Sequence, residues 1–136
     1  MIVVDTNVLL ALLGISESTP YARRAFKRDR AWAMPRLWRY EFANALTTLV
    51  RGRSMAQADA ESIWREAFAR FSPNEREVDT LHALRLASKF GITGYDAHFV
   101  ALADELGVPL VTNDRRSLAS KCPASLVVRL SSFAAE

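Results

Sequence analysis

The stretch that decides the fold is the N-terminal run Met1-Ile2-Val3-Val4-Asp5-Thr6-Asn7-Val8-Leu9-Leu10. Apolar residues lead directly into a polar Asp-Thr-Asn triplet, and a second apolar run follows. This pattern predicts a buried parallel strand that ends where a helix begins. Asp5 then lies at the carboxyl end of a strand, which is the edge where ligands and reactive groups collect in open α/β sheets.

The same design returns near the C-terminus, where residues 108–114 read Val-Pro-Leu-Val-Thr-Asn-Asp. Two parallel strands would thus deliver the carboxylates of Asp5 and Asp114 to one edge of the sheet. Asp114 has an alternative role as the N-cap of a short turn over residues 115–120. The hydroxyl and amide neighbours of the two acids are Thr6, Asn7, Thr112 and Asn113.

A third acid, Glu41, lies on a helix that we expect from Arg36 to Arg51. At about 100° per residue, the apolar residues of this segment form one stripe. Its members are Trp38, Phe42, Ala45, Leu46 and Leu49. Glu41 falls at the border of the stripe, so its side chain is expected to point along the edge of the core. An ordinary exposed glutamate is the alternative interpretation.

A fourth acid, Asp96, lies in the run Ile92-Thr93-Gly94-Tyr95-Asp96-Ala97-His98-Phe99-Val100-Ala101-Leu102-Ala103. Thr93, three residues earlier, can form a capping box with it, which is a purely structural role. Phe99 and Val100 lie three and four residues beyond Asp96, which places the carboxylate on the buried stripe of the helix. An inward carboxylate must be satisfied by donors or by a cation, because an unpaired buried charge is very costly.

Local signals also place the remaining elements. Pro35 is expected to start the helix that carries Glu41, and Ser54 to cap the next helix. The C-terminal residues 131–136 are expected to trail off without regular structure. Further helices are expected over residues 7–13, 20–28, 55–71 and 78–90, the last built on Leu81, Leu84, Leu86 and Ala87, and further strands over residues 31–34 and 126–130.

Composition limits the class of protein. A chain of 136 residues and 15.2 kDa, half of them hydrophobic, suits one compact domain over residues 1–136. The lone Cys122 cannot form an internal disulfide, and no apolar leader is evident, so a reducing cytoplasm is the expected compartment. Charges interrupt every run that approaches the roughly 20 apolar residues of a transmembrane helix, so we expect a soluble protein without a membrane partner.

The charge pattern favours a phosphate-rich partner. The formal net charge is +3, and with four acids assigned to one site the remaining 18 bases face 11 acids, a balance of +7. Such a surface attracts a polyanion. A cluster of carboxylates without accompanying cysteines or histidines suits Mg²⁺ or Mn²⁺ better than zinc. Such an ion lowers the pKa of a bound water and supports hydrolysis of a phosphodiester. His82 and His98 are poorly placed to act as a general acid and base pair instead.

The four acidic segments together resemble a known family. Residues 3–7 (Val-Val-Asp-Thr-Asn), 39–46 (Arg-Tyr-Glu-Phe-Ala-Asn-Ala-Leu), 95–103 and 111–114 look like the acidic motifs of PIN-domain ribonucleases. In length and motif order the whole chain resembles the VapC toxins of toxin–antitoxin pairs. The resemblance implies a PIN-like three-layer α/β/α domain, with a central parallel sheet of four to five short strands flanked by helices.

The resemblance also implies a function. It is Mg²⁺- or Mn²⁺-dependent endonucleolytic cleavage of RNA by a toxin that inhibits translation, in a homodimer that a VapB-like antitoxin inhibits. Asp5 and Asp96 would be the principal metal ligands, Asp114 a second ligand or water-mediated support, and Glu41 a ligand or the residue that orients the attacking water. Thr6, Asn7 and Thr112 match positions that support the ligands. Some relatives carry another acid after the last Asp, whereas here Arg115 and Arg116 follow as candidate phosphate contacts.

Two other functions remain open at this point. An apolar strand followed by Asp-Thr-Asn also resembles phosphatases that use a nucleophilic Asp, although these have a second Asp where Asn7 stands. A catalytically silent PIN-like binding module is the other alternative. Rossmann-type cofactor binding is disfavoured, because no Gly-rich loop follows Asp5.

Overall fold

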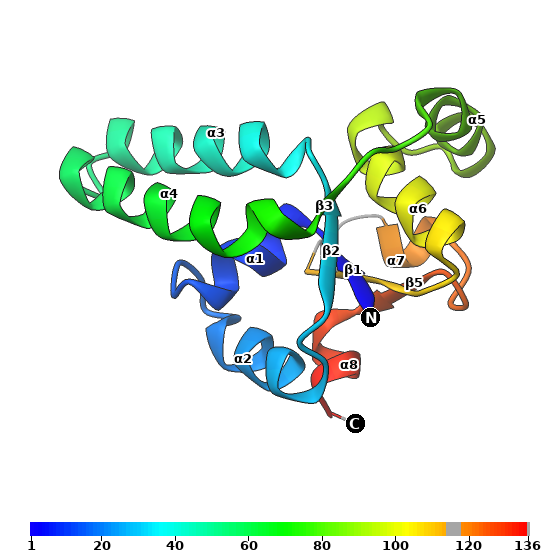
Figure 1. The fold of residues 1–136 in the computed structure, drawn as a ribbon, viewed down its shortest axis with the longest axis horizontal. Helices are drawn as coiled ribbons and strands as arrows, with labels where there is room; N and C mark the ends of the chain where they lie inside the picture. The colour runs from blue at the N-terminus through cyan, green and yellow to red at the C-terminus, as the bar shows by residue number, and fades with distance from the viewer. Residues whose placement is uncertain (114–117, 136) are drawn as a thin grey trace.

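The computed structural model describes residues 1–113 and 118–135. Five short strands form one parallel sheet in the order β3-β2-β1-β4-β5 (Figure 1). Their bounds are β1 (Ile2–Val4), β2 (Trp32–Pro35), β3 (Glu75–Arg76), β4 (Leu110–Thr112) and β5 (Val127–Arg129). The N-terminal strand is central, pairing with β2 on one side and β4 on the other. This confirms the expected central sheet of four to five parallel strands.

Helices cover both faces of the sheet, which gives the three-layer arrangement (Figure 1). One face packs against α1, α2, α3, α4 and α8, and the other against α5, α6 and α7. Their bounds are α1 (Thr6–Leu12), α2 (Thr19–Arg28), α3 (Trp38–Arg51), α4 (Gln57–Phe71), α5 (Thr80–Phe90), α6 (Gly94–Leu106), α7 (Leu118–Lys121) and α8 (Leu130–Ala135), with a short 3₁₀ turn η1 (Ser72–Asn74) before β3.

The strand β1 shows why its sequence is apolar throughout. Successive side chains of a strand point to opposite faces of the sheet. Ile2 and Val4 accordingly join the core on the α1 side, while Val3 joins the core on the α6 side. Because helices cover both faces, all three residues are buried, and the strand has no polar position before Asp5.

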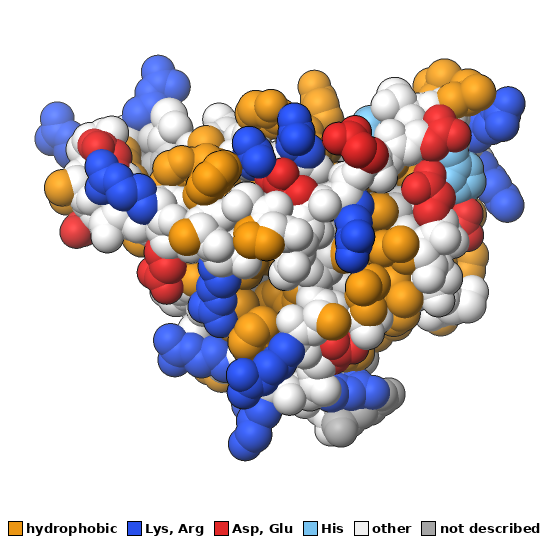
Figure 2. Space-filling view, viewed as in Figure 1, with side chains coloured by type: hydrophobic (Ala, Val, Ile, Leu, Met, Phe, Trp, Pro, Cys, Tyr) orange, Lys and Arg blue, Asp and Glu red, His pale blue; other side chains and the backbone are white. Residues whose placement is uncertain are grey.

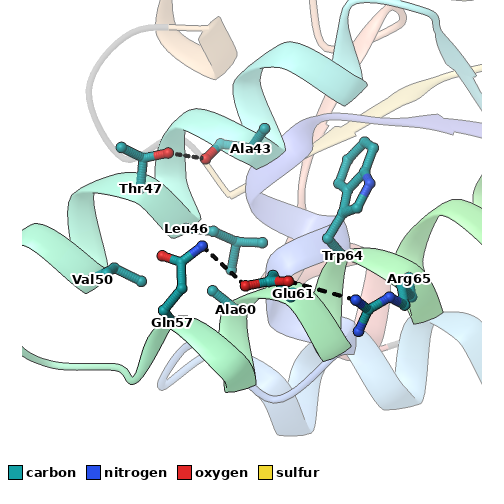
Figure 3. Close-up of a pocket in the computed structure, with 9 residues that line it drawn as sticks. All are labelled: Ala43, Leu46, Thr47, Val50, Gln57, Ala60, Glu61, Trp64 and Arg65. Atoms are coloured by element: carbon teal, nitrogen blue, oxygen red, sulfur yellow. Dashed lines mark hydrogen bonds and ion pairs between the residues drawn. The ribbon is translucent and has the colours of Figure 1, made fainter.

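Helices α3 and α4 form a hairpin that extends away from the sheet (Figure 1). An aromatic cluster holds its base together: Trp38 stacks on Trp64 with ring centroids 5.5 Å apart and meets Phe71 edge-on at 5.7 Å. Farther out, an open groove of about 290 Å³ lies between the two helices (Figure 3). We call it the α3–α4 groove; it is lined by Ala43, Leu46, Thr47, Val50, Gln57, Ala60, Glu61, Trp64 and Arg65.

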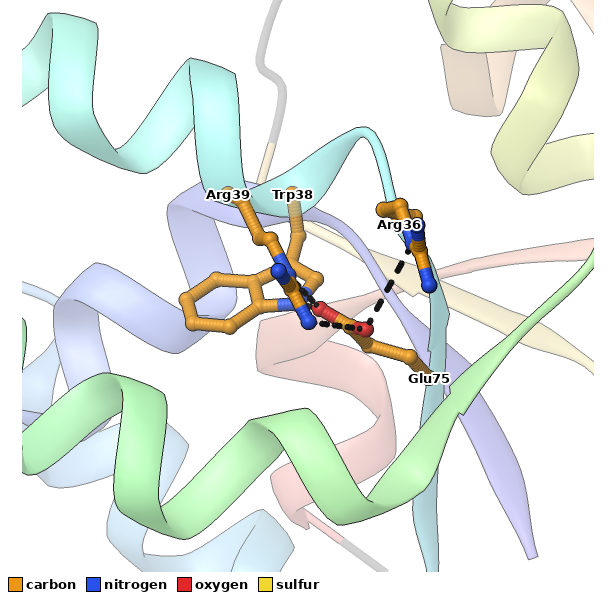
Figure 4. A network of polar contacts seen from close by, with 4 residues as sticks. All are labelled: Arg36, Trp38, Arg39 and Glu75. Carbon is orange, nitrogen blue, oxygen red and sulfur yellow. Dashed lines mark hydrogen bonds and ion pairs between the residues drawn. The ribbon is translucent and has the colours of Figure 1, made fainter.

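Glu75 on the edge strand β3 forms hydrogen bonds and ion pairs with residues at the start of α3 (Figure 4). The Trp38 indole nitrogen donates to its Oε1 at 2.7 Å, and the Arg39 guanidinium donates to both carboxylate oxygens, to Oε2 at 2.8 Å. Arg36 adds a longer ion pair of 3.9 Å. Burial raises the pKa of Glu75, but the bonds from Arg39 and Trp38 outweigh it and hold that pKa below its ordinary value.

Basic side chains are unevenly spread over the surface. Figure 2 shows Lys and Arg gathered over α2 and over the outer end of the α3–α4 hairpin, with Asp and Glu more frequent toward α5 and α6. Within the described part of the chain, no helix is both long enough and apolar enough to cross a bilayer.

Several expected boundaries were wrong. Pro35 is the last residue of β2, and α3 begins at Trp38. Ser54 does not cap α4, which begins at Gln57 with Ala56 as its N-cap. In α5, Ala83 and Leu86 are buried, whereas Leu81 and Leu84 are exposed, because the helix packs mainly against α6 and the rest of its surface faces away from the core.

The C-terminal segment was expected to trail off but forms α8. Leu130 and Phe133 are buried in the core on the α2 side. The Arg28 guanidinium lies 4.2 Å from the centre of the Phe133 ring and donates a 2.7 Å hydrogen bond to the Phe133 carbonyl. The helix is therefore stabilised by contacts with α2, which its short sequence does not reveal.

Candidate active site

Asp5 lies where β1 ends and α1 begins, as expected. It is the N-cap of α1, and its Oδ1 accepts a hydrogen bond from the Val8 amide at 3.1 Å. Its Oδ2 accepts a bond from the Thr112 hydroxyl at the end of β4. Only 7% of Asp5 is exposed. The two neighbouring strand ends are thus joined through one carboxylate, whose orientation is fixed by a donor at each oxygen.

Glu41 reaches the same edge of the sheet from the first turn of α3. The Thr6 hydroxyl, next to Asp5 in the chain, donates a 2.7 Å hydrogen bond to Glu41 Oε1. Burial raises the pKa of Glu41 above its ordinary value, and the negative charge of Asp96 adds to the rise. The bond from Thr6 and the charge of His98 oppose this rise without cancelling it. Glu41 and Asp96 are therefore close enough for their charges to interact.

Asp96 lies in the first turn of α6. Thr93 is the N-cap, and its hydroxyl accepts a hydrogen bond from the Asp96 amide at 3.1 Å, so the threonine half of the expected capping box is present. The Asp96 side chain is half-buried. The segment therefore combines both interpretations, because the backbone of Asp96 serves the cap while its carboxylate faces the cavity described next.

Asp5, Glu41 and Asp96 line a single cavity of about 260 Å³, which we call the acid pocket. Its remaining walls are Thr6, Asn7, Leu10, Asn44, Ala45 and Phe99. The strands end at this edge of the sheet. The helix α3 follows β2 and the helix α6 precedes β4, and both begin at this edge because the chain must run back across the sheet between parallel strands. Three of the four acids from the sequence analysis are thus brought together.

The other site residues have separate placements. Thr6 binds Glu41, Thr112 binds Asp5, and Asn7 lines the acid pocket. Asp114, Arg115 and Arg116 lie outside the described residues. The chain enters that segment through Asn113, whose side-chain amide donates to the buried Ser18 hydroxyl at 3.0 Å.

Sequence reasoning missed Asn44 as part of the acid pocket and His98 as a neighbour of Glu41. Asn44 follows Glu41 by three residues on α3, and this i, i+3 spacing, which had already placed Phe99 with Asp96, is the signal that would have found it. His98 was expected to be poorly placed for acid–base chemistry, and its charge nevertheless reaches Glu41. Its Nδ1 donates to the Gly94 carbonyl at 2.5 Å.

The pocket suits a hard divalent cation in its donor chemistry. Among the described residues, no three carboxylate, histidine or cysteine side chains converge tightly enough to hold an ion alone. Mg²⁺, however, usually keeps several waters and takes only one or two protein carboxylates. Burial and the charge of Asp96 disfavour the ionised form of Glu41, and a cation in the pocket would relieve this repulsion.

The class of protein that has this fold and this pocket is identified by comparison with known families. Residues 2–122 match the PIN domain family. Ribonuclease VapC3 from Pyrobaculum aerophilum is 35% identical over 127 residues, covering 90% of this chain and 95% of the relative. The chain therefore belongs to the PIN-domain family, among the VapC-type endoribonucleases.

Two solved structures share the architecture. The crystal structure of PAE2754 from Pyrobaculum aerophilum is 27% identical with a TM-score of 0.75, and the match covers 99% of this chain and 97% of that one. The crystal structure of FitAcB from Neisseria gonorrhoeae is 14% identical with a TM-score of 0.67, covering 96% and 98% of the two chains. The second likeness concerns the fold alone.

Proposed function

We propose that this protein hydrolyses RNA phosphodiester bonds in a metal-dependent reaction at the acid pocket. The observation that carries the proposal is the meeting of Asp5, Glu41 and Asp96, from β1, α3 and α6, at the carboxyl edge of the sheet. Carboxylates gathered in a partly buried cavity repel one another unless a cation or protons neutralise them. The ribonuclease name of the VapC3 relative supports RNA as the substrate class.

The metal ion is proposed to be Mg²⁺ or Mn²⁺. When bound, it supplies a water of lowered pKa and neutralises charge on the leaving oxygen. Asp5 and Asp96 are the proposed principal ligands, with Asp114 as a second ligand or a water-mediated support. The Val8 amide and the Thr112 hydroxyl hold Asp5 in one orientation, which is the kind of support that metal ligands need.

Glu41 is proposed as a ligand or as the residue that orients the attacking water. Thr6 fixes one of its oxygens, which limits the positions that the carboxylate can take. Its raised pKa makes it a better proton acceptor than an exposed glutamate. Arg115 and Arg116 are proposed phosphate contacts, and Asn7 a polar support in the wall of the pocket.

The proposal is tested with purified protein, single-stranded RNA and Mg²⁺ or Mn²⁺. Asp5→Asn and Asp96→Asn should each lower the cleavage rate by more than about 100-fold, because supports of metal ligands alone cost 10- to 100-fold. Asp59→Asn, the same change at an exposed position on α4, should keep full activity. Cleavage that survives a chelator, or that persists in both pocket variants, would overturn the proposal.

We further propose that the protein is a cytoplasmic toxin, inhibiting translation until a VapB-like antitoxin binds it. The α3–α4 groove is the proposed site for an antitoxin helix, because it is open, apolar at its floor and edged by Gln57, Glu61 and Arg65 (Figure 3). Among the apolar side chains of α3 and α4, Trp64 lines this groove, whereas Trp38 is fully buried and belongs to the core. Leu37 packs on the α6 side of the sheet.

A homodimer is part of the same proposal. Exposed apolar side chains are the groups that such an interface would bury, and Leu81 and Leu84 of α5 are two of them. Light scattering of the purified protein measures the assembly directly.

A further inference from the structure

Two exposed tyrosines directly precede acids of the acid pocket in the chain. Tyr40 precedes Glu41 on α3, and Tyr95 precedes Asp96 on α6. Tyr40 is 65% exposed and Tyr95 is 67% exposed, which makes them the two most exposed large hydrophobic side chains of the described residues. Neither ring is part of the hydrophobic core, so core packing does not explain why an aromatic residue stands at each position.

Helical spacing places both rings beside the pocket. Residues four apart on a helix share a face. Tyr40 lies four residues before Asn44, and Tyr95 lies four residues before Phe99, and both of these later residues line the acid pocket. Each tyrosine therefore continues a wall of the pocket by one turn, toward the N-terminal end of its helix.

Those helix ends lie at the rim of the sheet where the strands finish. The helix α3 follows β2 and the helix α6 precedes β4, so both begin at the carboxyl edge that holds Asp5. The tyrosines are thus carried on two separate helices, α3 and α6, each of which also contributes one acid to the pocket.

We propose that Tyr40 and Tyr95 are positioning residues that stack on RNA bases on either side of the phosphodiester in the acid pocket. The proposal rests on the ribonuclease function proposed above. Stacking on aromatic side chains is the usual way in which single-stranded RNA is held, since every base has a π face and unpaired bases can splay outward. The arrangement would select single-stranded RNA over a duplex, whose bases stay within their own stack.

The test measures RNA binding without cleavage, in the presence of a chelator. The probe is a fluorescently labelled random-sequence RNA of about 10 nucleotides, a length within the range bound by single-strand-binding folds. Tyr40→Ala and Tyr95→Ala should each weaken its binding by about 5- to 100-fold. Tyr40→Phe and Tyr95→Phe should bind like wild type, because they keep the ring. Leu106→Ala, at the far end of α6 and 38% exposed, is the matched control and should change nothing.

A second arm uses the substrate. An RNA with abasic sites at its central positions should bind wild type as weakly as intact RNA binds the alanine variants, and those variants should lose nothing further with it. In cleavage assays with metal, the alanine variants should raise KM while kcat changes little, because stacking positions the substrate without taking part in the chemistry.

Several results would overturn the stacking proposal: no binding of the probe by wild type, alanine variants that bind RNA normally, or phenylalanine variants as weak as the alanine ones. A change in oligomeric state of the tyrosine variants that accompanies the loss of RNA binding would assign these residues to a protein interface instead. Cleavage with normal KM in the alanine variants would remove the stacking role and leave the nuclease intact. Tyrosine-dependent RNA binding without metal-dependent cleavage would keep the stacking role and overturn the proposed nuclease function.

Discussion

At the scale of single residues, folding disfavours the ionised form of Glu41 in the acid pocket. Glu41 is partly buried beside the charge of Asp96, and only Thr6 and His98 counteract this. Functional sites often contain such perturbed groups, because a site that must hold a cation or take up a proton cannot also be optimal for stability. The pocket therefore predicts a stability that depends on pH and on metal.

The first prediction concerns Glu41→Gln in metal-free protein. Since the pKa of Glu41 is raised on folding, its favourable contribution is present below its ordinary value of 4.5 and is lost as the pH rises through the raised folded-state value. At pH 7 the glutamine variant should therefore unfold at a higher urea concentration than wild type, and the difference should shrink in acid. Saturating Mg²⁺ should stabilise wild type more than the variant.

The control for this experiment is Glu66→Gln, the same change at an exposed position on α4. It should leave the urea midpoint unchanged across the pH range. A wild type that is more stable than Glu41→Gln at pH 7 without metal would contradict the assigned cause of the pKa shift.

At the scale of elements, a two-residue strand depends on one carboxylate. The strand β3 pairs with β2 only through Met34 and Pro35, so its backbone contributes few ladder bonds. Glu75 compensates by joining Trp38 and Arg39 in the first turn of α3 (Figure 4). Because α3 also carries Glu41, this contact fixes the helix that delivers an acid to the pocket.

Glu75→Gln should lower the free energy of unfolding at pH 7 by about 1–2 kcal/mol, the usual loss when a hydrogen bond to a charged group becomes neutral. The pKa of Glu75 is lowered by folding, so its stabilisation is present above 4.5 and is lost as the pH falls through the folded-state value. The difference between wild type and variant should therefore vanish in acid. Urea unfolding measures both effects.

The matched control is Glu61→Gln, which removes an exposed i, i+4 ion pair with Arg65 on α4. Exposed pairs of this kind contribute little, so its stability should match wild type at every pH. Equal losses in the two variants would show that general surface charge, and not the contact between β3 and α3, is responsible.

At the scale of the whole molecule, the acid pocket and the α3–α4 groove are built on the same helix. The pocket lies beside the first turn of α3, and the groove lies along its outer half. A partner seated in the groove would therefore lie close to the substrate without occupying the pocket. This arrangement allows inhibition and catalysis to be separated by mutation.

Ala43→Lys places a long charged side chain on the exposed wall of the α3–α4 groove. It should weaken binding of the antitoxin by more than about 10-fold, as expected for a change at the centre of an interface. The variant should keep its RNA cleavage but resist inhibition. The measurements are copurification with a VapB-like antitoxin and inhibition of RNA cleavage by it.

Ala58→Lys, the same change at an exposed position of α4 that does not line the groove, is the control and should still be inhibited. Full inhibition of Ala43→Lys would place the antitoxin on a different surface.

The amino-acid sequence by itself determined four of the parallel strands (β1, β2, β4 and β5), the helix that follows Asp5 and the edge of the sheet at which acids gather. These features follow from local patterns: apolar runs that end in polar triplets, caps such as Thr93, and helical periodicity around Phe42. The tertiary structure alone decided β3, α8 and the pairing of Thr6 with Glu41. Short elements and side-chain pairs distant in sequence carry little local signal, because their stability comes from contacts that exist only after the chain has folded.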